Sequence, residues 1–104
     1  MRSALRRSLA CTAIMLAQPV FAADADNGSR LAHRWCEACH VIAPSQSRAS
    51  TDQAPPFATI AARPDFDAGK LTLFLLDPHP KMPDMSLTRA EAADLAAYIG
   101  SLKK

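Results

Sequence analysis

The stretch Cys36-Glu37-Ala38-Cys39-His40 constrains this chain more than any other feature, because one chemical object accounts for its three reactive side chains. C-x-x-C-H is the signature by which a c-type haem is attached covalently. Two thiols add across the two vinyl groups of one porphyrin, and one helical turn between Cys36 and Cys39 separates the sulfurs as the ring edge requires. His40 follows directly, so its imidazole is carried under the ring to ligate the iron. Such a chain must supply a second ligand and a pocket.

Two other kinds of site could use the same cysteines. A structural zinc ion would need a fourth ligand beyond Cys36, Cys39 and His40, with His79 or His33 as the candidates, and such sites usually draw on two separated ligand pairs. A thiol redox pair of the thioredoxin type would follow a strand in a βαβ pattern, and no part of this sequence alternates like a strand. The sequence therefore favours haem over zinc and over thiol redox chemistry.

The first 22 residues have the pattern of a secretory signal peptide. Residues 1–7 carry three arginines and no acid, residues 9–17 form an apolar run interrupted only by Thr12, and residues 20–22 place small side chains at the two positions that a signal peptidase reads. This run is shorter than the about 20 residues that a membrane span needs. We therefore expect residues 1–22 to be a signal peptide cleaved near Ala22, with export to the periplasm and no stable membrane insertion afterwards.

Cleavage would change the charge and the cysteine count of the protein. Residues 23–104 retain nine Lys and Arg against ten Asp and Glu, so the net charge becomes about −1 and the apparent +2 belongs to the signal. No cluster of basic residues remains, and we expect no binding of nucleic acid. Only Cys36 and Cys39 are left. A domain this small often needs a cross-link or bound group to stabilise it, and a covalent haem would serve as one.

The sequence predicts three helical segments before a final helix at the C-terminal end. Residues 24–34 fit a first helix capped by Asp24 or Asp26. Gly28 lies within it, where glycine costs up to about 1 kcal/mol relative to alanine, so we expect another helix to approach closely there. Residues 41–56 have the composition of a loop, and residues 57–62 of a short helix. Residues 66–76 predict a three-turn helix, apolar nearly all round, which suits packing between a cofactor and other core.

The last helix carries the strongest signals. Thr88-x-x-Glu91 is a capping box, and Asp94 is expected to face water. One side of this helix is thin because it is built from alanines, so another helix can come close, and Gly28 is the expected counterpart. The apolar residues that follow at helical spacing are Leu95, Tyr98, Ile99 and Leu102.

A proline-braced segment at residues 77–85 precedes that helix. Three prolines in six residues exclude a helix interior and hold the backbone extended. A rigid segment that presents a methionine suits an axial iron ligand, because the soft thioether favours ferrous iron and raises the reduction potential of a His-ligated haem. These residues favour Met82 and leave Met85 and His79 open. Pro55 is the candidate carbonyl acceptor for the other ring nitrogen of the axial histidine.

Taken together, the signal peptide, the C-x-x-C-H motif, the Met-Pro segment and the terminal amphipathic helix resemble a small class I cytochrome c over the whole mature chain. Gly28 stands eight residues before Cys36, as does the glycine of that family's first helix. Tyr98 is about where the family has an aromatic residue on its C-terminal helix. Met82, sixteen residues earlier, is close to the family's axial methionine. The resemblance thus favours Met82 as the ligand and matches the family's histidine-holding proline to Pro55.

The resemblance implies an all-α fold of about four helices around one covalently attached haem, with residues 23–104 as a class I cytochrome c domain. The expected function is one-electron transport in the periplasm by a protein that is not an enzyme. Its partners would be a donor dehydrogenase or reductase and an acceptor oxidase or other cytochrome, met as a monomer or within a hetero-complex. The alternatives are an electron-transfer subunit of a periplasmic dehydrogenase and an open-site haem enzyme or sensor. The implied haem-binding residues are Cys36, Cys39, His40 and Met82, with His40 and Met82 as the iron ligands.

Overall fold

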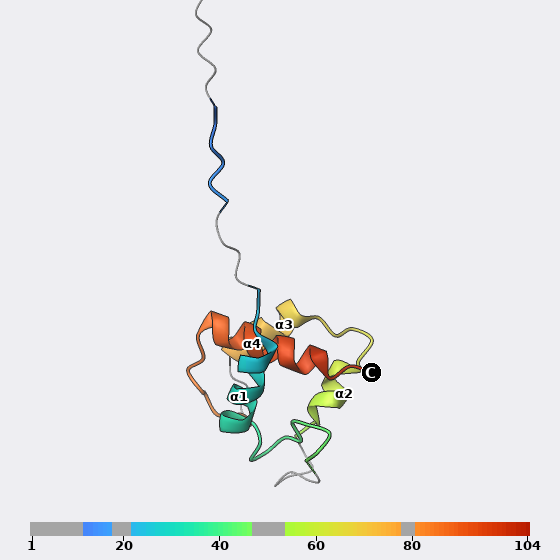
Figure 1. The fold of residues 1–104 in the computed structure, drawn as a ribbon. Helices are drawn as coiled ribbons and strands as arrows, with labels where there is room; N and C mark the ends of the chain where they lie inside the picture. The colour runs from blue at the N-terminus through green and yellow to red at the C-terminus, as the bar shows by residue number, and fades with distance from the viewer. Residues whose placement is uncertain (1–11, 18–21, 47–53, 78–80) are drawn as a thin grey trace, which may run out of the picture.

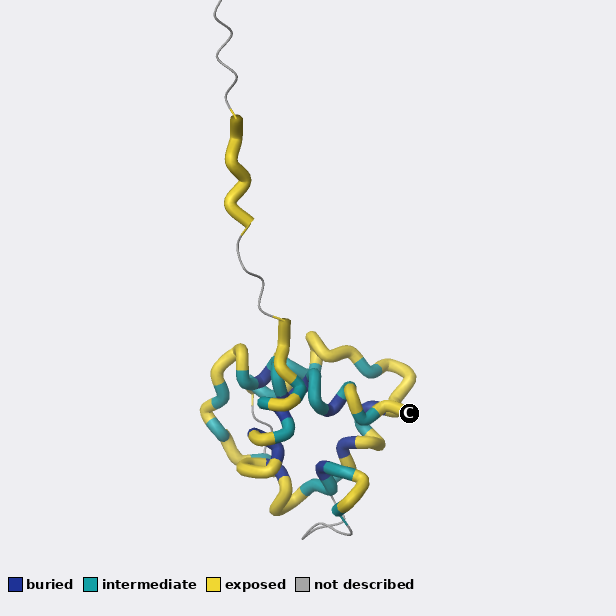
Figure 2. The backbone as a smooth tube through the Cα atoms, in the orientation of Figure 1, coloured by how far each residue is buried: buried dark blue, intermediate teal, exposed yellow. Residues whose placement is uncertain are grey.

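The computed structural model describes residues 12–17, 22–46, 54–77 and 81–104. These residues contain four α-helices, as predicted, and the all-α fold is confirmed (Figure 1). None of the helices in these ranges is both long and apolar enough to cross a membrane. Residues 12–17 are exposed and stand apart from the helical body (Figure 2). The helices are α1 (Ala25–Trp35), α2 (Phe57–Ala61), α3 (Ala68–Leu76) and α4 (Arg89–Ser101).

Side-chain caps define where the first and last helices begin. The Asp24 carboxylate accepts hydrogen bonds from the Asp26 and Asn27 amides at 3.0 and 3.1 Å, so Asp24 is the cap of α1. Both halves of the predicted capping box are present on α4. The Glu91 amide donates to the Thr88 hydroxyl at 3.1 Å, and the Thr88 amide donates to the Glu91 carboxylate at 3.0 Å. These local signals place both helix starts to within one residue of the prediction.

Helices α1 and α4 cross each other (Figure 1), and Gly28 lies where they meet. A Cβ atom on Gly28 would lie 2.0 Å from the Asp94 carbonyl oxygen and 2.7 Å from the Tyr98 Cβ atom. Because real side chains do not approach backbone so closely, only glycine lets the two helices meet at this distance. The predicted close approach at Gly28 is confirmed.

The same crossing corrects the prediction that Asp94 faces water. Its two carboxylate oxygens accept hydrogen bonds from the Asp24 amide at 2.7 Å and from the Asn27 side-chain amide at 2.8 Å. The close crossing places the first turn of α1 over this carboxylate, and the positive end of a helix dipole favours a negative charge there. Asp94 therefore ties the start of α1 to the middle of α4.

Helix α3 begins at Ala68, two residues later than predicted, because Asp67 caps it by accepting from the Lys70 amide at 2.8 Å. It packs on α4, yet none of its residues is buried, and the Leu73 and Phe74 side chains are 63 % and 48 % exposed. This agrees with the expectation of a helix packed between other core and a cofactor, since the polypeptide alone leaves part of its apolar surface uncovered. The buried core lies elsewhere and comprises Leu31, Ala32, Cys36, Ile42, Phe57, Ala61, Ala92, Leu95, Ala96 and Ile99.

Candidate functional site

The Cys36–His40 motif forms one tight turn at the end of α1. The Cys36 amide still donates to the Ala32 carbonyl, as the helix pattern requires, at 2.9 Å. The Cys39 and His40 amides both donate back to the Cys36 carbonyl, at 3.1 and 2.8 Å. This turn brings both thiols and the imidazole to the wall of the same cavity. The three side chains that the sequence analysis linked are thus placed together, as covalent attachment of one haem requires.

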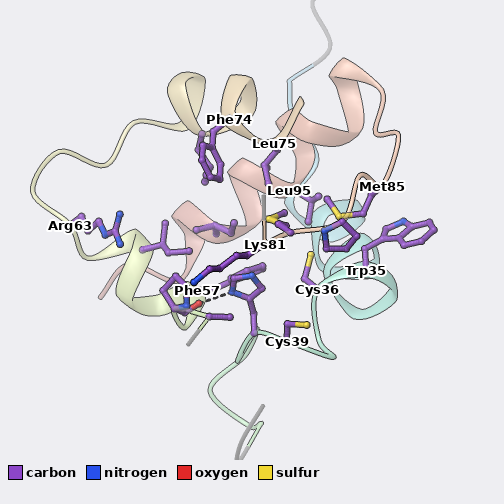
Figure 3. A pocket seen from close by; sticks show the side chains of 18 residues that line it. Trp35, Cys36, Cys39, Phe57, Arg63, Phe74, Leu75, Lys81, Met85 and Leu95 are labelled. Atoms are coloured by element: carbon purple, nitrogen blue, oxygen red, sulfur yellow. Dashed lines mark hydrogen bonds between the residues drawn. The ribbon is translucent and has the colours of Figure 1, made fainter. Parts of the chain in front are cut away.

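The cavity beside this turn has a volume of about 490 Å³, within the range of cofactor sites. Most of its lining is apolar, and Figure 3 shows Cys36 and Cys39 along one side with Phe74 and Leu75 of α3 across from them. The incompletely covered apolar face of α3 therefore borders a space rather than polypeptide. Further lining residues are Trp35, Ala54, Phe57, Ile60, Leu71, Pro83, Leu95 and Ile99. A flat, apolar macrocycle fits this chemistry.

The His40 ring is held by a backbone carbonyl. Its Nδ1 atom lies 2.7 Å from the Pro55 oxygen, the contact drawn as a dashed line in Figure 3. A proline carbonyl can only accept, so Nδ1 carries the proton and Nε2 is left as the free donor atom for a metal. The Phe57 ring packs against the imidazole, with the ring centroids 5.2 Å apart. The Pro55 acceptor expected from the sequence is confirmed, and its hydrogen bond fixes the tautomer and orientation of a ligand histidine.

Two methionines reach the cavity from the segment before α4. Met82 and Met85 are both half-buried and both line the wall. A soft sulfur atom is therefore available on the same cavity as the His40 imidazole. His79, the third candidate, lies outside the described residues, and the choice of Met82 stays a prediction.

Burial disfavours the thiol redox alternative. Burial, with a smaller contribution from the neighbouring Cys39, raises the pKa of the Cys36 thiol from 9.0 to about 11. Reactive C-x-x-C pairs do the opposite, because they need a thiol whose pKa is lowered. Both cysteines are free thiols. A buried thiol with a raised pKa is poorly suited to repeated thiol exchange.

The described residues also give no support to a zinc site. Among them, no group of three or more His, Cys, Asp or Glu side chains is arranged to hold a metal ion. His33, one of the candidate fourth ligands, is exposed and lies 3.1 Å from the Glu37 carboxylate. The donor set at the cavity fits a haem iron, with one imidazole and one thioether, better than it fits zinc.

Several residues of the site were missed or left undecided by the sequence analysis. Arg63 and Lys81 both line the otherwise apolar cavity, and no acidic side chain does so among the described residues. Lys81 was not singled out, although its position beside Met82 was a signal. Tyr98 was predicted for its aromatic ring, but its hydroxyl also donates to the Ile42 carbonyl at 2.7 Å. That bond joins α4 to the loop after His40.

Comparison with known proteins shows a clear relationship. No protein-family model matches the chain, and no solved structure matches it. Among curated proteins, the cytochrome c-552 of Bradyrhizobium diazoefficiens is 61 % identical over 82 residues, which cover 79 % of this chain and 78 % of that protein. Such identity over most of both chains agrees with the motif turn, the cavity and the held histidine described above. The chain therefore belongs to the small c-type cytochromes, electron carriers that hold haem c covalently and pass electrons between redox proteins.

Proposed function

We propose that residues 23–104 form a periplasmic carrier of single electrons, with one haem joined to Cys36 and Cys39 and its iron ligated by His40 and Met82. The observation that carries this proposal is the convergence of two free thiols, an imidazole with its Nδ1 proton engaged and a methionine sulfur on one apolar cavity. The bound haem supplies a one-electron redox couple.

The residues around the proposed haem explain how the protein would transfer an electron without a reaction on a substrate. The Pro55 carbonyl holds the imidazole of His40 in one orientation, and Pro83 directly after Met82 restricts the backbone that presents the sulfur. His40 and Met82 would together hold the iron and leave it no site for a substrate, so the proposed role is that of a carrier and not of an enzyme. The thioether favours the reduced state and raises the reduction potential.

Two cationic side chains suit the two carboxylates that a haem carries. Among the described residues that line the cavity, Arg63 and Lys81 are the cationic side chains. We assign them the haem propionates, because a carboxylate taken out of water needs a partner of opposite charge. Two other arginines lie near the motif in the sequence. Arg34 stacks on Trp35, with its guanidinium 4.9 Å from the ring centroid, and Arg48 lies outside the described residues.

Export to the periplasm is supported by the N-terminal residues. They follow the order of a signal peptide, and residues 12–17 are exposed and separate from the helical body. The 82 residues aligned with the relative equal the length of residues 23–104. In that compartment the partners would be a donor dehydrogenase or reductase and an acceptor oxidase or cytochrome. A net charge near −1 suits brief docking through apolar side chains such as Trp35 and Phe74.

Substitution of each methionine tests the ligand assignment. In the ferric protein, sulfur ligation gives a charge-transfer band, which we expect Met82→Ala to abolish and the matched variant Met85→Ala to retain. Carbon monoxide should bind ferrous Met82→Ala readily and the unaltered protein poorly. Loss of the band in Met85→Ala alone would reassign the ligand. An unaltered protein that lacks the band and binds carbon monoxide readily would favour the open-site enzyme or sensor.

A further inference from the structure

The backbone of residues 40–42 is fixed by hydrogen bonds to side chains and to a backbone amide from other parts of the chain. The Gln46 side chain spans them, since its Nε2 group donates to the His40 carbonyl at 3.0 Å and its Oε1 atom accepts from the Ile42 amide at 2.9 Å. The Phe57 amide donates to the Val41 carbonyl at 2.9 Å. Four backbone polar groups are satisfied in this way, counting the Ile42 carbonyl that accepts from the Tyr98 hydroxyl at 2.7 Å.

A β-turn sets the position of Gln46. Its amide donates to the Ala43 carbonyl at 3.1 Å, which closes a turn over residues 43–46. Pro44 occupies the second position of that turn, where its fixed φ angle is favoured. The turn returns the chain toward the motif, so the half-buried Gln46 side chain reaches back over His40 and Ile42. A glutamine suits this place because one side chain presents a donor and an acceptor together.

The segment between these contacts also carries the iron ligand. On the ring side, His40 Nδ1 is bonded to Pro55 at 2.7 Å, and on the backbone side its carbonyl is bonded to Gln46 at 3.0 Å. The direction of an imidazole follows its backbone, so a fixed His40 carbonyl keeps the ring in line with the Pro55 acceptor. Tyr98 adds a link from Ile42 to α4, close to the Gly28 crossing.

We propose that Gln46 is a positioning residue for the axial histidine, assisted by Tyr98, and that it maintains the His40–Pro55 hydrogen bond and thereby the reduction potential. This inference rests on the proposed role of His40 as an iron ligand. A strong Nδ1 hydrogen bond makes the imidazole a more basic ligand, which stabilises the ferric state. Loosening the residues after His40 weakens that bond and shifts the potential in the positive direction.

The test compares Gln46→Leu and Tyr98→Phe with Asn27→Ala in the haem-loaded protein. Asn27→Ala is the control. It removes the side-chain hydrogen bonds of Asn27, to Asp94 at 2.8 Å and from Arg30 at 3.4 Å, and among the described residues none of its hydrogen bonds reaches residues 40–46. Three quantities are measured for each: the solvent exchange rate of the His40 Nδ1 proton by NMR of the ferrous protein, the reduction potential, and the midpoint of unfolding.

Both test variants should speed Nδ1 exchange about five-fold or more, the scale of one hydrogen bond lost, and should raise the potential. Asn27→Ala should lower stability and leave both other quantities unchanged. If Gln46→Leu loses stability like the control but keeps the exchange rate and potential of the unaltered protein, Gln46 is merely structural and the inference is overturned. Tyr98→Phe removes one hydroxyl only and decides the matter if Gln46→Leu does not fold. Failure of the unaltered protein to retain haem would instead overturn the proposed function.

Discussion

Gly28→Ala places a methyl group where α1 meets the backbone of α4. The added Cβ atom would lie 2.0 Å from the Asp94 oxygen, whereas ordinary contact begins near 3.4 Å, so the helices must separate by more than 1 Å. Overpacking of a filled site typically costs about 1–3 kcal/mol, and the upper end applies here because the obstacle is backbone. The helix propensity of alanine returns about 1 kcal/mol. We expect a net loss of about 2 kcal/mol in the free energy of unfolding.

Urea unfolding of the haem-loaded protein measures this loss, and the melting temperature should fall by roughly 8–16 °C for a domain of this size. Gly69→Ala is the matched control, because Gly69 is also helical but exposed, and its added Cβ atom would meet only the Asp67 side chain at 3.2 Å. The control should change the stability by no more than about 1 kcal/mol in either direction, because the gain in helix propensity is offset by any displacement of the Asp67 cap. If Gly28→Ala behaved like Gly69→Ala, the close crossing of α1 and α4 would be refuted.

Three further predictions concern stability and docking. Asp94→Ala removes the acceptor of two hydrogen bonds, from Asp24 and Asn27, and should lower the free energy of unfolding in urea by about 1–3 kcal/mol; no change would show that this tie is dispensable. Thr88→Ala removes the cap of α4 and should cost about 1 kcal/mol in the same assay, whereas an unchanged midpoint would contradict the capping box. The rate of electron transfer to a redox partner should depend weakly on salt, because the mature charge is near −1, and a steep fall would contradict apolar docking.

Structural features that depend only on residues close together in the sequence were predictable. The Thr88–Glu91 capping box, the Asp24 cap and the turn at Cys36–His40 depend on neighbours within a few residues, so their patterns are local. The close helix crossing at Gly28 was predictable, because a glycine within a helix lowers the stability of that helix unless another segment needs to come close. The grouping of the two cysteines and the histidine at one cavity was predictable, because attachment of one haem explains their spacing.

The features that could not be predicted from the sequence are mostly contacts between residues far apart in the chain. Asp94 bonds to a residue 70 positions away, and Tyr98 to one 56 positions away, and no local pattern marks either pair. Gln46 lies in a stretch without periodicity, where only the turn built on Pro44 gave a signal. Helix α3 differs from these features, because its nearly all-round apolar pattern did predict packing between a cofactor and other core. Its exposed Phe74 is explained by the cavity.

The central claim is that one haem is joined covalently to this chain through Cys36 and Cys39. The direct test is the intact mass of the protein, exported by a cell with a haem-maturation system and measured after denaturation. We expect the mass of residues 23–104 plus one haem, and the mass of the polypeptide alone when both cysteines are replaced by alanine. A denatured protein that carries no haem, with both cysteines in place, would contradict the account.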